Sequence, residues 1–164
     1  MNQPSETVDA TRRLILQGAA VLALIATGGI RFGLTPAVAA ADAKYPEDAF
    51  KQKNSDDAIK ALYGKTAEAS DKIKLDAPEI AENGAVVPVA VSSTLADVTS
   101  ISILVAENPN ALVASYRIPA GTMANVANRL KMAKTSNVIA VVEAGGKRYS
   151  ATKEVKVTVG GCGG

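Results

Sequence analysis

The chain has 164 residues, which suits one domain plus a targeting segment, and its 48% hydrophobic and 21% charged residues are ordinary for a globular protein. The net charge of +2 comes without a dense run of lysine or arginine, and aromatic residues make up only 4%, so nucleic-acid binding is not expected. Histidine is absent and there is one cysteine, which excludes an internal disulfide and a cysteine-ligated cluster and argues against a bound metal, a cofactor or an independent enzyme.

Residues 1–40 have the pattern of an export signal. Arg12 and Arg13 stand directly before an apolar run, Leu14–Ile30, which three glycines make only mildly hydrophobic. The run leads to Ala37-Val38-Ala39, a small-x-small cleavage site. Paired arginines before a weak apolar region resemble a twin-arginine (Tat) signal, and this predicts a periplasmic protein without a membrane anchor. A Sec signal and an uncleaved anchor are the alternatives, although a spanning helix needs roughly 20 apolar residues.

The Tat prediction leads to a hypothesis about a partner. The Tat route accepts folded proteins, and many of them carry cofactors. This chain has almost no side chains that could hold a cofactor. A partner without a signal of its own, exported together with this chain, would explain the choice of route.

A short helix is predicted near the start of the mature domain, between Tyr45 and Gly64. Proline and two acidic residues at positions 46–48 suit a first helical turn, and Gly64 suits a C-terminal stop. Asn54-Ser55 is a candidate interruption. The face toward the core is predicted to consist of Phe50, Ala58, Ala61 and Leu62.

From residue 71 onward the hydrophobic pattern has a period of two, which predicts strands. We expect about seven of them: 71–76, 86–93, 98–105, 111–118, 126–133, 137–144 and 147–159. In the last strand Lys153 breaks the alternation, which indicates a bulge or a sheet edge, and Pro88 indicates the same for its own strand. Gly145-Gly146 suits a two-residue hairpin. Short strands at this spacing predict an all-β fold, an immunoglobulin-like antiparallel β-sandwich spanning residues 41–159 with the short helix.

The last five residues form a separate segment, a predicted flexible arm over 160–164. Glycine occupies four of its positions, Gly160, Gly161, Gly163 and Gly164, and Cys162 stands at its centre. Glycine has no side chain to bury and loses the most backbone entropy on ordering, so the last strand should end near Val159. Cys162 can then stand roughly 10 Å beyond the strand, at about 3.3–3.6 Å per residue.

This setting predicts a carrier thiol that a partner's active site activates. The sequence has no histidine to lower the pKa of the thiol, and the arm is narrow enough to enter a channel. The alternative is a tail cysteine that forms an intermolecular disulfide. A prenylation box needs three residues after the cysteine, and here there are two. Ubiquitin-like sulfur carriers also end in Gly-Gly, but the leader and the strand pattern point away from them.

With these features the chain resembles the SoxY family of sulfur carriers. The resemblance covers the Tat-type leader, the short helix, the sandwich and the terminal Gly160-Gly161-Cys162-Gly163-Gly164. It implies covalent attachment of sulfur to Cys162 during thiosulfate oxidation, and a heterodimer with a SoxZ-like subunit. It also implies three enzymes that act on the carrier: a c-type cytochrome complex, a hydrolase with a metal centre and a molybdenum–haem dehydrogenase. The competing interpretation is an exported β-sandwich interaction module that dimerises through Cys162.

Overall fold

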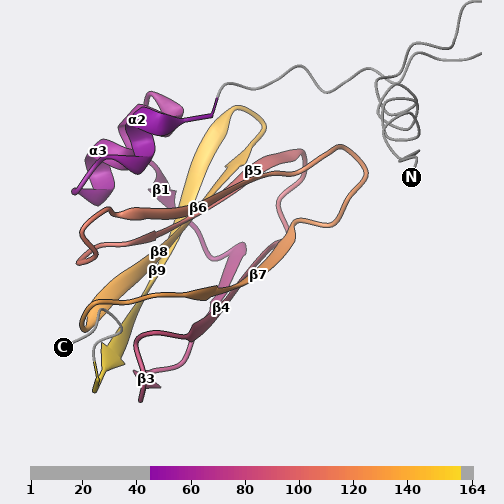
Figure 1. Cartoon of the computed structure of the whole chain (residues 1–164). Coiled ribbons are helices and arrows are strands. Elements are labelled where there is room, and N and C mark those ends of the chain that lie inside the picture. The colour runs from indigo at the N-terminus through magenta and orange to yellow at the C-terminus, as the bar shows by residue number, and fades with distance from the viewer. Residues whose placement is uncertain (1–44, 160–164) are drawn as a thin grey trace, which may run out of the picture. The chain divides into compact units, whose positions relative to one another are not determined.

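The computed structural model describes residues 45–159, which form a mostly β domain of two sheets with two short helices (Figure 1). The helices are α2 (Glu47–Phe50) and α3 (Ser55–Tyr63). The strands are β1 (Glu68–Ala69), β2 (Ile73–Asp76), β3 (Ile80–Ala81), β4 (Val87–Ser93), β5 (Val98–Val105), β6 (Leu112–Arg117), β7 (Asn125–Leu130), β8 (Ser136–Ala144) and β9 (Lys147–Val157). The larger sheet has the order β1-β9-β8-β5-β6, with β3 also paired to β9, and the smaller sheet has the order β2-β4-β7.

The seven predicted strands correspond to β2 and β4–β9, so the mostly β prediction is confirmed. The strand count is wrong, because the described residues contain nine strands. The two additional strands, β1 and β3, have two residues each and pair in parallel with β9. Two residues are too few to show an alternation, and their pairing depends on a strand that lies far along the sequence. The immunoglobulin-like connectivity stays a prediction.

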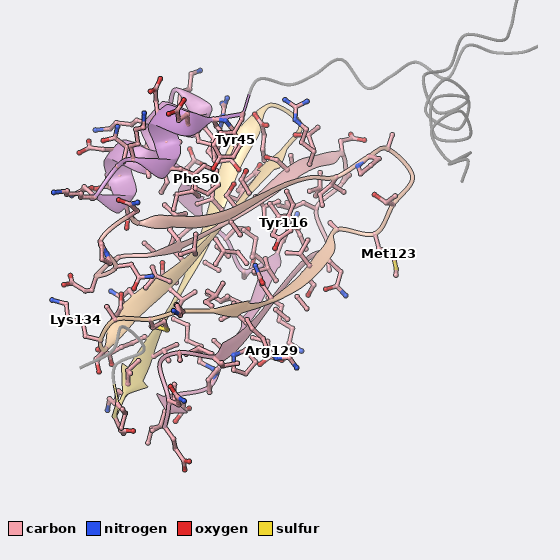
Figure 2. The ribbon with its side chains drawn as sticks, in the orientation of Figure 1. Tyr45, Phe50, Tyr116, Met123, Arg129 and Lys134 are labelled. Atoms are coloured by element: carbon pink, nitrogen blue, oxygen red, sulfur yellow. The ribbon has the colours of Figure 1, made fainter. Side chains whose placement is uncertain are left out.

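The main core lies between the two sheets. Alternate residues of β4 point inward, and Val87, Val89 and Val91 are almost fully buried while Pro88 between them is exposed. On the larger sheet the inward residues come from β5, β6, β8 and β9: Ile101, Ile103, Val105, Ala114, Val138, Ala140, Val142 and Val155. Burial of one such branched side chain stabilises the fold by about 1.5–3 kcal/mol. Figure 2 shows side chains of both sheets filling the space between them.

The helices cover the opposite face of the larger sheet, where a second apolar cluster forms. Its buried residues are Ala49, Ala58, Ile59, Leu104, Leu112 and Val141. Strand β8 is therefore covered on both faces, which explains its almost continuous run of apolar residues. The face predicted for the helix is partly wrong, because Ala61 is exposed and Ile59 is buried in its place.

The single helix expected between Tyr45 and Gly64 is divided in two at the predicted interruption. Asn54 is the N-cap of α3, and its side-chain oxygen accepts hydrogen bonds from the backbone N–H groups of Asp56 (2.8 Å) and Asp57 (3.4 Å). Gly64 ends α3 with a φ of 72°, a left-handed conformation that favours glycine, as predicted.

The expectations for the irregular positions in the strands are also resolved. β8 and β9 pair without interruption from Ser136↔Val155 to Ala144↔Lys147, so Lys153 lies at no bulge. The ammonium of Lys153 donates to the Ala77 carbonyl. Lys153 lies on a stretch of the β9 edge that falls between the short pairings of β9 with β1 and with β3. Pro88 lies where β4 pairs with β7 alone, which is a local edge.

The side chain of Tyr63 joins the end of α3 to the larger sheet, and a substitution can test how much this contact stabilises the domain. The hydroxyl of Tyr63 forms hydrogen bonds with Ser100 Oγ (3.0 Å) and Ser102 Oγ (2.8 Å). We expect Tyr63→Phe to lower the free energy of unfolding by about 1 kcal/mol, the usual contribution of such bonds. The matched control is Tyr45→Phe, because Tyr45 is 64% exposed, and it should have no measurable effect. Denaturation by urea measures both, and equal stability of the two variants would contradict the assignment.

Candidate functional site

The described part of the chain ends at Val159, two residues after β9, and hydrogen bonds hold this end on two sides. On one side β3 pairs with β9 through Ile80↔Lys156 and Ala81↔Val157. The backbone N–H of Thr158 then donates to the Ala81 carbonyl at 3.1 Å. On the other side the Val157 N–H donates to Thr135 Oγ1 at 2.9 Å.

A loop at residues 82–86 completes this anchor. The N–H of Gly84 donates to the carbonyl of Val159 at 2.8 Å, and the Gly84 carbonyl accepts from the N–H of Met132 at 2.7 Å. Asn83 shapes the loop, because its side-chain oxygen accepts from the N–H of Ala85 at 2.8 Å. Met132 is fully buried. The loop therefore connects the end of β9 to the core at a defined position.

Three exposed apolar side chains lie in these segments. Ile80, Val86 and Val159 are 59%, 55% and 62% exposed, and they make up three of the five large hydrophobic side chains exposed within residues 45–159. The other two, Tyr45 and Met123, lie elsewhere along the chain (Figure 2). All three belong to segments that hold the end of β9, so the apolar side chains exposed there make this end a candidate interaction surface.

The predicted site residues themselves lie outside the described residues. This holds for Cys162 and its flanking Gly160, Gly161, Gly163 and Gly164, and also for Arg12 and Arg13 of the leader. Covalent geometry still limits the position of Cys162, because three residues after Val159 span at most about 10–11 Å. The anchor of β9 thus determines the region that the thiol can reach.

The sequence did not identify the residues that form this anchor. Asn83-Gly84 carries a turn signal, but the contact with Val159 becomes visible only when distant segments are placed together. Thr135 gives no signal at all, since a threonine before a strand is common. Within residues 45–159 no three His, Cys, Asp or Glu side chains lie close enough to hold a metal ion. In the same part of the chain no helix is long and apolar enough to cross a membrane.

Two of the comparisons with known proteins point to the same family. The family model described as "Sulfur oxidation protein SoxY" matches residues 59–162. The solved structure of the sulfur carrier protein SoxY from Chlorobium limicola f thiosulfatophilum is 47% identical, with a TM-score of 0.59, and the match covers 63% of this chain and 96% of that one. A superoxide reductase (neelaredoxin) from Ignicoccus hospitalis is 19% identical over 52% of this chain and 80% of its own, with a TM-score of 0.47. Among curated proteins no significant match was found.

The anchor predicts a local effect that hydrogen exchange can detect. Thr135→Val removes the acceptor of the Val157 N–H while keeping the shape of an exposed side chain. We expect the Val157 amide to exchange roughly two- to tenfold faster, the equivalent of one lost hydrogen bond. Thr122→Val is the control, because the Thr122 hydroxyl donates to Pro119 in a distant connection. Unchanged exchange at Val157 would show that Thr135 does not hold the end of β9.

Proposed function

The chain belongs to the SoxY family of sulfur carrier proteins of the thiosulfate oxidation system, whose members are not enzymes, and we propose that its carrier residue is Cys162. The observation that carries the proposal is the extent of the family match, which ends at residue 162. That position is the only cysteine in the chain. A cysteine thiol is also the one side chain here that can form a reversible bond to sulfur.

The proposed cycle begins with two reactions at Cys162. In the first, Cys162–SH and thiosulfate join with loss of one proton and two electrons, giving Cys162–S–S–SO₃⁻. A c-type cytochrome complex accepts the electrons. In the second, water cleaves the terminal S–S bond, giving Cys162–S–SH, sulfate and a proton, and a partner hydrolase catalyses this step. Where a sulfane dehydrogenase is present, it takes six electrons from Cys162–S–SH while three waters add their oxygens, giving Cys162–S–SO₃⁻ and seven protons. Hydrolysis of that group then releases sulfate and a proton and returns Cys162–SH.

The role of this chain is to present the thiol. We propose that residues 160–164 form a narrow arm that enters the active sites of partner enzymes. The fixed position of Val159 supports this proposal, because a movable thiol needs a fixed starting point. The exposed Ile80, Val86 and Val159 lie where a partner that engages the arm would make contact.

We further propose a SoxZ-like subunit as the stable partner. β4 and β8 are both rich in consecutive apolar residues, a pattern that suits strands covered on both faces. For β8 the helices of this chain provide the cover, so that run no longer supports a partner. Among residues 45–159 none covers the outer face of β4 in this way: Pro88 is exposed, Ala90 is half-buried, and the exposed Ala127 of β7 lies opposite Ala90. Small side chains on an open sheet suit packing against a second sheet.

The carrier role is tested by the mass of the arm after incubation with thiosulfate and the cytochrome partner. We expect wild-type protein to gain the mass of one thiosulfate, and Cys162→Ser to gain nothing. Because the proposed arm forms no part of the two apolar clusters found within residues 45–159, the variant should melt at the wild-type temperature. Appearance of disulfide dimers without any thiosulfate adduct would instead favour an interaction module.

A second variant separates delivery of the thiol from its reactivity. Replacing Gly161 and Gly163 together by valine keeps Cys162, but widens the arm and excludes positive φ values. Alkylation by iodoacetamide should stay near the wild-type rate, whereas enzyme-dependent conjugation should fall strongly. Conjugation at the wild-type rate would contradict the narrow-arm proposal.

Export by the Tat route to the periplasm, together with the partner, is the last part of the proposal. It rests on Arg12 and Arg13 and on the family's place in a multi-protein system. Changing both arginines to lysine should leave the precursor and its partner in the cytoplasm together, as cell fractionation would show. Normal periplasmic accumulation of the variant would indicate a Sec signal.

A further inference from the structure

A row of charged and polar residues crosses the larger sheet on the face that carries the helices. Cross-strand pairing aligns Arg148 of β9 with Glu143 of β8, then Ser100 of β5, then Arg117 of β6. Directly opposed residues in antiparallel strands point to the same face, so the four side chains share one surface. The row lies beside the helix-covered apolar cluster and belongs to neither core.

This row forms one wall of a cavity of about 630 Å³. Other lining residues come from the start of the described chain and from the ends of α2 and α3: Tyr45, Pro46, Phe50, Leu62 and Tyr63. The rings of Tyr45 and Phe50 stack at a centroid distance of 5.1 Å with an interplanar angle of 6°. Apolar side chains therefore line the same cavity as the polar row, and their partial exclusion of water strengthens electrostatic interactions there.

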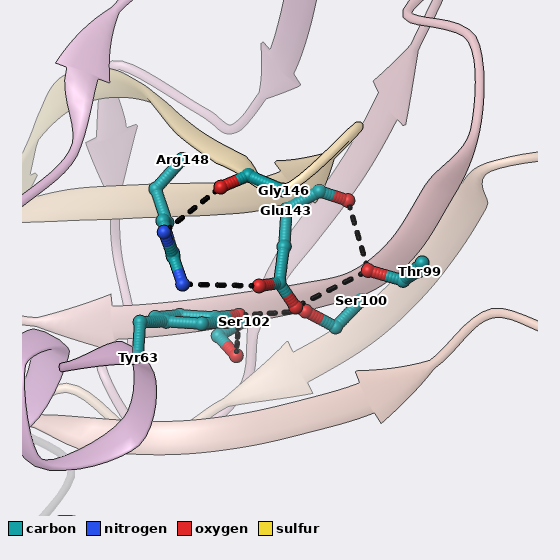
Figure 3. Close-up of polar contacts among 7 residues, drawn as sticks. All are labelled: Tyr63, Thr99, Ser100, Ser102, Glu143, Gly146 and Arg148. Atoms are coloured by element: carbon teal, nitrogen blue, oxygen red, sulfur yellow. Dashed lines mark hydrogen bonds and ion pairs between the residues drawn. The ribbon is translucent and has the colours of Figure 1, made fainter. Parts of the chain in front are cut away.

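Two arginines and one glutamate line this cavity, so positive charge exceeds negative charge there. Figure 3 shows the contacts of Arg148 and Glu143. Arg148 Nη2 lies 3.4 Å from Glu143 Oε1, a long ion pair, and Nη1 donates to the Gly146 carbonyl at 2.9 Å. The Nε of Arg148 is buried and donates to no described residue. The other oxygen of Glu143 accepts from Thr99 Oγ1 at 3.2 Å. Arg117 takes part in none of the ion pairs found within residues 45–159.

The hydroxyl groups beside the arginines leave one hydrogen free to donate. Ser100, Tyr63, Ser102 and Ser115 form a chain in this order, joined by hydrogen bonds of 3.0, 2.8 and 2.9 Å. Four hydroxyl hydrogens serve three bonds, so one hydrogen remains for a further acceptor. Burial raises the pKa of Tyr63, which keeps its hydroxyl protonated at neutral pH.

We propose that this cavity binds a small oxoanion of the sulfate class. Arg117 and Arg148 supply the charge, and the hydroxyl chain supplies a neutral donor. Guanidinium groups match the oxygens of a tetrahedral anion, and the exposed Arg117 enters no ion pair within residues 45–159. The site is separate from Cys162: Arg148 and Val159 are eleven residues apart along an extended segment, about 36 Å at 3.3 Å per residue. The proposal therefore stands independently of the carrier function.

The test is a titration of the full chain with sodium sulfate, followed by NMR. The signals observed are the Arg148 Nε–H and the backbone amide of Ser100, with sodium chloride at equal ionic strength as reference. We expect saturable shifts with sulfate and none with chloride. Parallel titrations with thiosulfate and phosphate show which oxoanion binds most tightly.

Variants assign the binding to these residues. Arg117→Gln changes an exposed side chain, so the fold should persist, and affinity should fall about tenfold or more, as for a lost hydrogen bond to a charged group. Arg129→Gln is the matched control, because Arg129 is an exposed arginine on the other sheet (Figure 2). Shifts that follow ionic strength alone, or equal affinity of Arg117→Gln and wild type, would overturn the proposal. Binding of an acidic peptide without binding of sulfate would also overturn it, and would assign the cavity to a partner's carboxylate.

Discussion

The pairing register of β8 with β9 is the constraint on which both ends of this domain depend. Nine residue pairs join the two strands, and the turn between them uses Gly145 and Gly146 with φ values of 55° and 74°. Such a two-residue turn fixes the register at one end. Farther along, Val155 is fully buried in the core. A slip by one residue would turn Val155 outward and Arg148 inward, so slipped pairings are strongly disfavoured.

This register has two consequences that lie far apart in the fold. At the turn end it sets Arg148 opposite Glu143, at the margin of the cavity under α3. At the other end it determines where β9 meets β3 and the loop at Gly84, and therefore where the chain leaves the domain. The helices contribute to the turn end only: their apolar cluster covers Val141, and Phe50, Leu62 and Tyr63 line the cavity beside the polar row.

Prediction from the sequence succeeded where structure depends on neighbouring residues. The period of two in hydrophobicity predicted both ends of β5 correctly. Gly145-Gly146 predicted the turn between β8 and β9, and Gly64 predicted the end of α3. It failed where pairing depends on distant segments, as for β1, β3 and the hydroxyl of Thr135. The polar row was equally hidden, since Arg117 and Arg148 become neighbours of one cavity only through the register of four strands. The prediction of Cys162 came from composition and from a family resemblance, and the described residues bear on it only through the position of Val159.

The fixed position of Val159 limits how any reaction at Cys162 can occur. Three residues span at most about 10–11 Å, so a reacting partner must bring its active site within that distance of the end of β9. A protein that approaches so closely must also come near Ile80 and Val86, which belong to the segments that hold β9. Different enzymes that act on one thiol would therefore share this small apolar surface and compete for it. Contact there must also be weak enough to break between steps, and the small number of exposed apolar side chains is consistent with that requirement.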